Sequence, residues 1–148
     1  MSKTNTCPIP QTYANKGAVI QNSTGNVGVT ATQAPSNTVL LYTAAANDAN
    51  VKAVIVTSDD SSARVMNVYL SPDSGTTFYL LGSVSIPITA GIATNPPVDV
   101  LANLVGLPID ASGRPCIPML ASERLYIGSQ TTVTSGKYLV ATAIVEEF

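Results

Sequence analysis

The sequence predicts an all-β fold: an antiparallel β-sandwich, jelly-roll or immunoglobulin-like, with one short inserted helix. Short runs of β-branched and apolar residues recur along the chain, and turn-forming residues separate them. Within one run, residues 65–71, apolar and polar residues alternate as they do in a strand with one buried face. No segments with the 10–15-residue helical pattern of parallel crossovers lie between the runs, which argues against a parallel sheet.

The length of 148 residues fits one domain with a single core. Residues 1–16 are mostly polar, and Pro8 and Pro10 favour an extended path, so we expect an N-terminal arm there. Residues 17–148 are expected to form the single sandwich domain. Arms of this kind either fray or lie over a neighbour, and the sequence leaves both open.

The central runs, residues 53–57 and 65–70, flank a polar patch at 59–62. Pro72 and Gly75 then suit a tight connection to the next strand. In the second run we expect Met66, Val68 and Leu70 to face the core, and Asn67 and Tyr69 to face outward. The other strands expected in this part of the chain are 17–21, 29–32, 38–43, 77–81 and 82–88, with a loop at 44–50.

The segment after residue 88 departs from the strand pattern. Residues 98–106 predict a short helix, with Pro97 in its first turn, Asp99 near its positive end and Gly106 at its close. A proline-rich loop, residues 107–118, follows this helix. Strands are expected again at 124–128 and 138–145.

The composition excludes several classes of function. Apolar residues make up 45% of the chain and charged residues 11%, against about 25% in typical soluble domains. So low a content of charged residues favours a protein that works as part of a larger assembly. The lysines and arginines are scattered singly, so we expect no nucleic-acid partner.

We also expect no membrane association, because no apolar run reaches 18 residues. Residues 1–16 lack the apolar core of a signal peptide, so synthesis in the cytoplasm without export by the usual route is expected.

No catalytic chemistry is evident. The chain has no histidine, which removes the commonest general base and the usual zinc ligand. Asp59 and Asp60 could join Asp48 in a calcium site, but the spacing of a calcium-binding loop is missing and a solvated turn is favoured. We therefore expect no enzyme, and no catalytic, cofactor-binding or metal-binding residues.

The two cysteines, Cys7 and Cys116, are distant in sequence and do not form a disulfide framework. Reduced thiols packed as small hydrophobic groups are the favoured interpretation. The sequence leaves a disulfide between them open.

Tyrosines are the main candidates for a binding surface. Tyr69 and Tyr79 could face outward together across the hairpin as a platform for a sugar, although tyrosines more often cap a core or fill a protein interface. With the arm, they give five candidate interface residues: Pro8, Pro10, Tyr13, Tyr69 and Tyr79.

Residues 37–81, NTVLLYTAAANDANVKAVIVTSDDSSARVMNVYLSPDSGTTFYLL, resemble a layout common in small virion proteins of tailed bacteriophages. There a strand containing LYT precedes a second strand, a polar turn and a hairpin. The later segments VDVLANLVGLP and YLVATAIVEEF occupy similar places. The resemblance covers roughly residues 36–148 and lies in the order of elements, not in a diagnostic motif.

This resemblance implies a capsid cement (decoration) protein on the outer surface of a virion. Its implied partners are the major capsid protein and further copies of itself, as a homotrimer. The alternative is a tail, baseplate or fibre component with a receptor- or carbohydrate-binding role, although the chain lacks the long coiled-coil shaft of a complete fibre. No catalytic residues carry over from such proteins.

Overall fold

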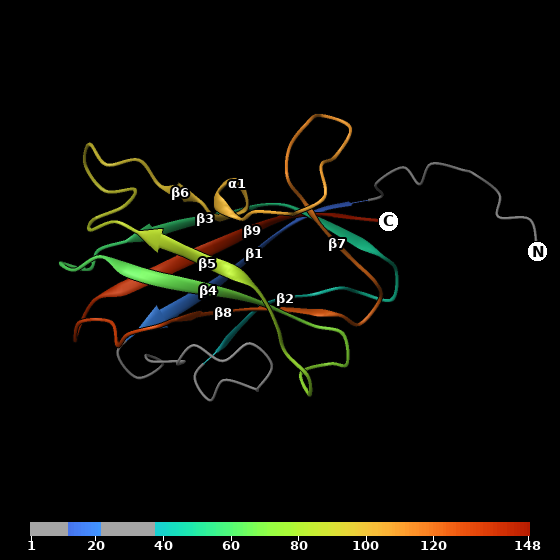
Figure 1. Ribbon diagram of the computed structural model, residues 1–148, viewed down its shortest axis with the longest axis horizontal. Coiled ribbons are helices and arrows are strands. Elements are labelled where there is room, and N and C mark those ends of the chain that lie inside the picture. Colours follow the sequence, from blue (N-terminus) through green and yellow to red (C-terminus); the bar gives the residue numbers. More distant parts are fainter. Residues whose placement is uncertain (1–11, 22–37) are drawn as a thin grey trace, which may run out of the picture.

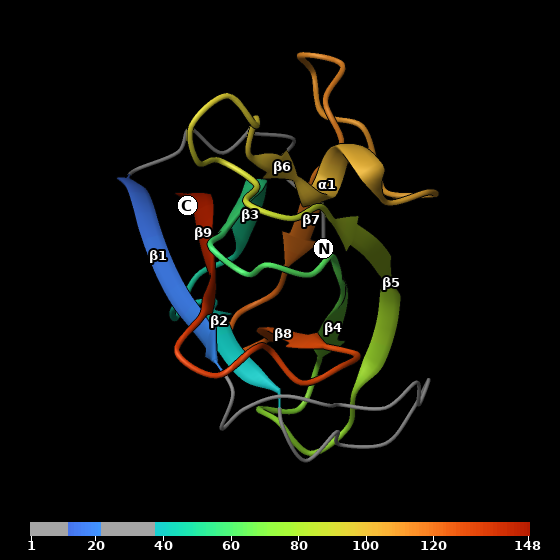
Figure 2. The same ribbon diagram turned by 90° about the vertical axis from the view of Figure 1, so that its left-hand side faces the viewer.

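Two antiparallel sheets packed face to face form the protein, and this confirms the all-β sandwich (Figures 1 and 2). The computed structural model describes residues 12–21 and 38–148. Sheet A has the order β1-β9-β3-β6, with β7 also paired to β3, and sheet B has the order β2-β8-β4-β5. The strands of sheet A are β1 (Thr12–Gln21), β3 (Ala49–Ser58), β6 (Val98–Asp99), β7 (Ile117–Met119) and β9 (Tyr138–Glu147). Those of sheet B are β2 (Val39–Thr43), β4 (Arg64–Ser71), β5 (Tyr79–Ile86) and β8 (Arg124–Ser129).

The core lies between the sheets and follows from alternation along the strands. In β9, Leu139, Ala141, Ala143 and Val145 are fully buried, and the residues between them are more exposed. The facing strands of sheet B contribute further fully buried side chains to the same cluster: Met66, Val68, Leu125 and Ile127. Burying a side chain of this size contributes about 1.5–3 kcal/mol, so these inward rows hold the two sheets together.

The one helix among the described residues, α1 (Val100–Asn103), closes one side of the sandwich between β3 and β5 (Figure 2). Leu104, the residue after it, presses against the backbone of β5, where a Cβ on Gly82 would lie 2.6 Å from the Leu104 Cδ2 atom. The helix is shorter than the expected 98–106. Val98 and Asp99 instead pair with β3 as β6, and the Asp99 carboxylate caps the helix by accepting from the Leu101 N–H at 3.2 Å.

The connection from β3 to β4 crosses from sheet A to sheet B, so these two strands do not form a hairpin with each other. Asp60 lies in this crossover and is fully buried, which corrects the expected solvated turn. Its carboxylate accepts from Arg64 Nε at 2.7 Å and from the Thr134 hydroxyl at 2.7 Å. Burial alone raises the pKa of Asp60, but these hydrogen bonds outweigh it and hold the pKa well below its ordinary value.

Several element boundaries differ from the sequence prediction. Residues 12–16, expected in the arm, form the first half of β1 because each pairs with β9. The two strands expected at 77–81 and 82–88 are one strand, β5, and β3 begins within the expected loop at Ala49. The end of the expected loop 107–118 forms part of β7, which pairs with the start of β3. The expected strand at 29–32 lies outside the described residues.

Cys116 is a free, buried thiol, as the sequence predicts, and Cys7 lies outside the described ranges. In the part of the chain that the structure describes, no helix is long and apolar enough to cross a membrane.

Candidate interaction surface

The outer face of sheet A, the side turned away from sheet B, is built mainly from uncharged residues. The register of β1, β9 and β3 places outward residues in three successive cross-strand rows. None of the nine residues in these rows is charged: Val19-Val140-Thr57, Gly17-Thr142-Ile55 and Asn15-Ile144-Ala53. We call this set the outer face of sheet A.

Three of its four larger apolar side chains are open to solvent, and the fourth, Ile55, is half-buried. Val19 is 46% exposed, and Val140 and Ile144 are each 38% exposed. Antiparallel sheets usually bury one face and present polar residues on the other. The β9 strand departs from that pattern because both alternating sets of its residues are largely apolar, with Tyr138, Val140 and Ile144 on the outward side.

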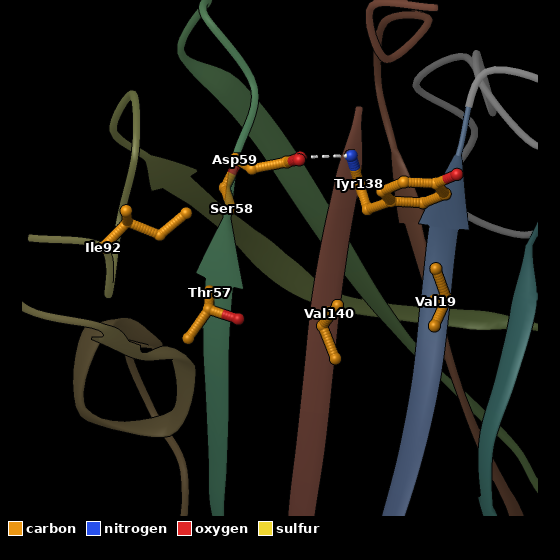
Figure 3. A pocket seen from close by; sticks show the side chains of 7 residues that line it. All are labelled: Val19, Thr57, Ser58, Asp59, Ile92, Tyr138 and Val140. Atoms are coloured by element: carbon orange, nitrogen blue, oxygen red, sulfur yellow. Dashed lines mark hydrogen bonds between the residues drawn. The ribbon is translucent and has the colours of Figure 1, made fainter. Parts of the chain in front are cut away.

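A hollow of about 380 Å³ lies at one end of this outer face. Figure 3 shows Thr57, Val140 and Val19 on three neighbouring strands, with Ile92 to one side and Tyr138 to the other. Ile92 and Tyr138 are 41% and 43% exposed. The hollow is therefore mainly apolar and open, with the carboxylate of Asp59 at its edge (Figure 3).

Hydrogen bonds and close packing hold the edges of the hollow in place. Asp59 accepts from the Tyr138 N–H at 2.6 Å through its carboxylate, and its own N–H donates to the Tyr138 carbonyl at 3.1 Å. The loop that carries Ile92 is fixed to β3 because the Ser58 N–H donates to the Ala90 carbonyl at 2.8 Å. Gly91 in this loop has φ +76°, and a Cβ there would lie 2.5 Å from Thr57 Cγ2. A larger residue at position 91 would therefore be strained.

Charged groups gather at the opposite end of the outer face. Lys52 forms ion pairs with Asp110 and with Glu146, the latter at 3.7 Å. The hydrogen bond from Lys52 lowers the pKa of Asp110 to about 2, and the same bond raises the pKa of Lys52. Lys52 thus pairs with both carboxylates, so we do not propose a ligand for this group of charges.

Of the five interface residues that the sequence proposed, the structure describes three. Pro8 and Pro10 lie outside the described residues. Tyr13 is 73% exposed and lies at the end of the outer face, in the row of Glu146. Tyr79 is 50% exposed but belongs to sheet B.

Tyr69 is fully buried, so the expectation that it faces a partner is wrong. Its ring meets Phe78, from the loop between β4 and β5, edge to face at a centroid distance of 6.4 Å. Phe78 in turn lies 4.8 Å from the ring of Tyr126. The loop thus brings an aromatic ring over the side of β4 that was expected to face solvent.

Asn67 is also fully buried, which corrects the second outward assignment. It donates to the Tyr69 hydroxyl at 2.9 Å and accepts from the Ser83 hydroxyl at 2.7 Å and from Gln130 Nε2 at 2.8 Å. The inward assignment holds for Met66 and Val68, which are fully buried, and Leu70 is partly buried against the core. The outer side of β4 is therefore a closed polar network.

Sequence reasoning missed the outer face of sheet A, although a signal for it was present. The segment 138–145, YLVATAIV, is apolar at both alternating sets of positions, which is unusual for a strand with one solvated face. The partners of β9, however, could not be known from one sequence.

The described ranges, 12–21 and 38–148, contain no group of three or more Cys, Asp or Glu side chains arranged to hold a metal ion. Comparisons with models of protein families, with characterised proteins and with solved structures find no match to this chain.

Proposed function

We propose that this protein is a structural virion protein that cements the outer surface of a bacteriophage capsid, attaching through the outer face of sheet A. The observation that carries the proposal is the set of three uncharged cross-strand rows, with Val19, Val140 and Ile144 exposed. Such a surface gains free energy when a partner removes it from water.

The size of this surface suits one part of a protein interface. The three rows span about five residues along each strand, about 17 Å, and three strands are about 14 Å wide, so the outer face covers roughly 230 Å². A standard interface buries about 800 Å² per partner, so the outer face would supply about a quarter to a third of one.

The sequence supports the same proposal through its low content of charge and through its resemblance to small virion proteins of tailed phages. The proposed partner is the major capsid protein, with the chain acting as a homo-oligomer, a trimer by resemblance. The stacking platform of Tyr69 and Tyr79, suggested for the alternative role in carbohydrate binding, is not formed because Tyr69 is buried.

The first test is the number of copies per virion, measured by quantitative mass spectrometry of purified particles. Hundreds of copies are expected for a cement protein. A few copies would place the chain in the tail or at one vertex, and its absence from particles would refute a virion role.

The second test asks whether the outer face makes the attachment. Particles stripped of the protein are incubated with the purified chain, with Val140→Lys, or with Leu40→Lys as a control on sheet B that is similarly exposed, at 43%. We expect the wild-type chain and Leu40→Lys to bind and to raise the temperature at which particles burst. This should hold even in 1 M salt, where the Debye length is about 3 Å and exposed ion pairs are strongly screened. Equal binding by Val140→Lys would exclude the outer face as the contact.

A further inference from the structure

A second pocket, of about 510 Å³, lies at the end of the sandwich where β3 begins and β9 ends, near the C-terminal label in Figure 1. It is separate from the outer face of sheet A, and both sheets contribute to it. We call it the end pocket. Its lining residues are Asp48, Ala49, Asn50, Leu70, Pro118, Met119, Leu120, Glu123 and Phe148.

The chemistry of the end pocket favours a peptide with apolar residues and a positive charge. Leu70, Met119 and Phe148 offer apolar contacts, and Leu120 is 64% exposed. Two carboxylates, Asp48 and Glu123, are the ionisable side chains of its lining. Asn50 also lines the pocket and adds a polar side chain to its wall.

We propose that the end pocket of one copy binds residues 1–11 of a second copy of this chain. This proposal goes beyond the capsid role and does not depend on it. Residues 1–11, MSKTNTCPIPQ, carry one charged side chain, Lys3, and the apolar group Pro8-Ile9-Pro10. Their charge is thus opposite to that of Asp48 and Glu123, and their apolar residues match the walls.

The position of Thr12 brings this segment to the correct end of the molecule. Thr12 pairs with Glu147, and Glu147 pairs on its other side with Ala49, which lines the pocket. Two strand spacings amount to about 10 Å. Eleven extended residues span up to about 36 Å, so the segment can reach beyond its own copy.

The two prolines favour a neighbouring copy over the same copy. Proline fixes its own φ and disfavours the helical region for the residue before it, so Cys7 and Ile9 are biased to extended conformations. To enter the pocket of its own copy, Ile9 would need the chain to turn sharply across β9 within the few residues before Thr12, whereas Pro10 favours an extended path. A neighbour that lies along the direction of β1 requires no such turn, and repeated exchange closes a symmetric oligomer.

Disulfide trapping in the full chain tests this proposal. Leu120→Cys places a thiol at the pocket rim, where Cys7 of a second copy would meet it, while the buried Cys116 remains out of reach. We expect mild oxidation to give disulfide-linked oligomers, and a reducing agent to convert them back to single chains. Val105→Cys, at a position 96% exposed on another loop, controls for random collisions. Leu120→Cys combined with Cys7→Ser controls for pairing between the two introduced thiols.

Two results would overturn the proposal: a cross-link confined to one chain, or oligomers that form no faster than in the two controls. Charge reversal gives an independent measurement by analytical ultracentrifugation. Lys3→Glu should weaken self-association by up to about fivefold, the upper end of the range for an exposed ion pair, and adding Asp48→Lys should restore it. No weakening, or no restoration, would contradict the docking. Both experiments use the isolated chain, so their failure would leave the capsid test unaffected.

Discussion

The outward residues of the central strands β4 and β9 differ in their exposure to solvent. On sheet B, the outward residues Asn67 and Tyr69 are fully buried, and the Asn67 side chain bonds to the Tyr69 hydroxyl, to Ser83 and to Gln130. On sheet A, Val140 and Ile144 remain exposed. The chain therefore covers the polar outward residues of β4 and leaves the apolar outward residues of β9 open.

This difference shows which face is available to a partner. A buried polar network whose members bond to one another has little to gain from a new contact, and disturbing it is costly. Exposed aliphatic side chains have no partners of this kind within the chain. Any partner that removes them from water lowers the free energy of the system.

The largest effect is expected when the same substitution is made on each face. Tyr69→Ala should lower the free energy of unfolding by about 3–5 kcal/mol, because it removes a fully buried ring and leaves the Asn67 amide without its acceptor. Tyr138→Ala, on the open face, should cost less than about 1 kcal/mol. Urea unfolding of both variants measures the contrast. Equal losses would mean that the two faces do not differ in this way.

A smaller effect is expected at the crossover that joins the two sheets. Asp60→Asn should cost about 3 kcal/mol at pH 7, because Arg64 loses its buried carboxylate partner. The pKa of Asp60 is below its ordinary 3.8 in the folded chain, so its stabilisation is complete above about pH 4 and is lost as the pH falls through the lower, folded value.

Stability of Asp60→Asn should therefore fall less steeply than that of the wild-type chain below pH 4. Asp73 and Asp110, each with a pKa of about 2, should retain their own acid dependence in the variant. Urea titrations at a series of pH values check this. Parallel pH curves for the two proteins would contradict the assigned role of Asp60.

The smallest effect on stability is expected from Val140→Thr, which keeps the shape of the side chain and adds a hydroxyl that water can reach. The free energy of unfolding should change by no more than about 0.5 kcal/mol. Binding of a fluorescent apolar dye to the folded chain should nevertheless decrease. A loss of stability comparable to that of Asp60→Asn would show that Val140 is part of the core.

Local patterns in the sequence were sufficient to predict most strands. Alternation placed Met66 and Val68 inside, and β-branched runs located β2, β4, β8 and β9 to within a few residues. Pro72 and Gly75 correctly marked the connection between β4 and β5, where Gly75 has φ +98°. These features depend on neighbours along the chain, so one sequence contains them.

The errors occur where distant residues decide the outcome. Tyr69 is buried because Phe78 folds back over it, and Asp60 is buried because Thr134 and Arg64 satisfy its carboxylate. Residues 12–16 are a strand because β9 pairs with them. The interaction surface was missed for the same reason, since its rows exist only after β1, β9 and β3 are assembled.

The position of β9 has a consequence for how the chain is made. This strand lies between β1 and β3 in sheet A, yet it follows every other described strand in the sequence, and Thr12 bonds to a residue 135 positions later. Neither β1 nor β3 can gain this neighbour until the ribosome has completed residue 147. Non-local pairing of this kind folds slowly and leaves strand edges exposed meanwhile. The apolar residues of β1 and β3 therefore remain open to aggregation until β9 has been synthesised and sheet A can close.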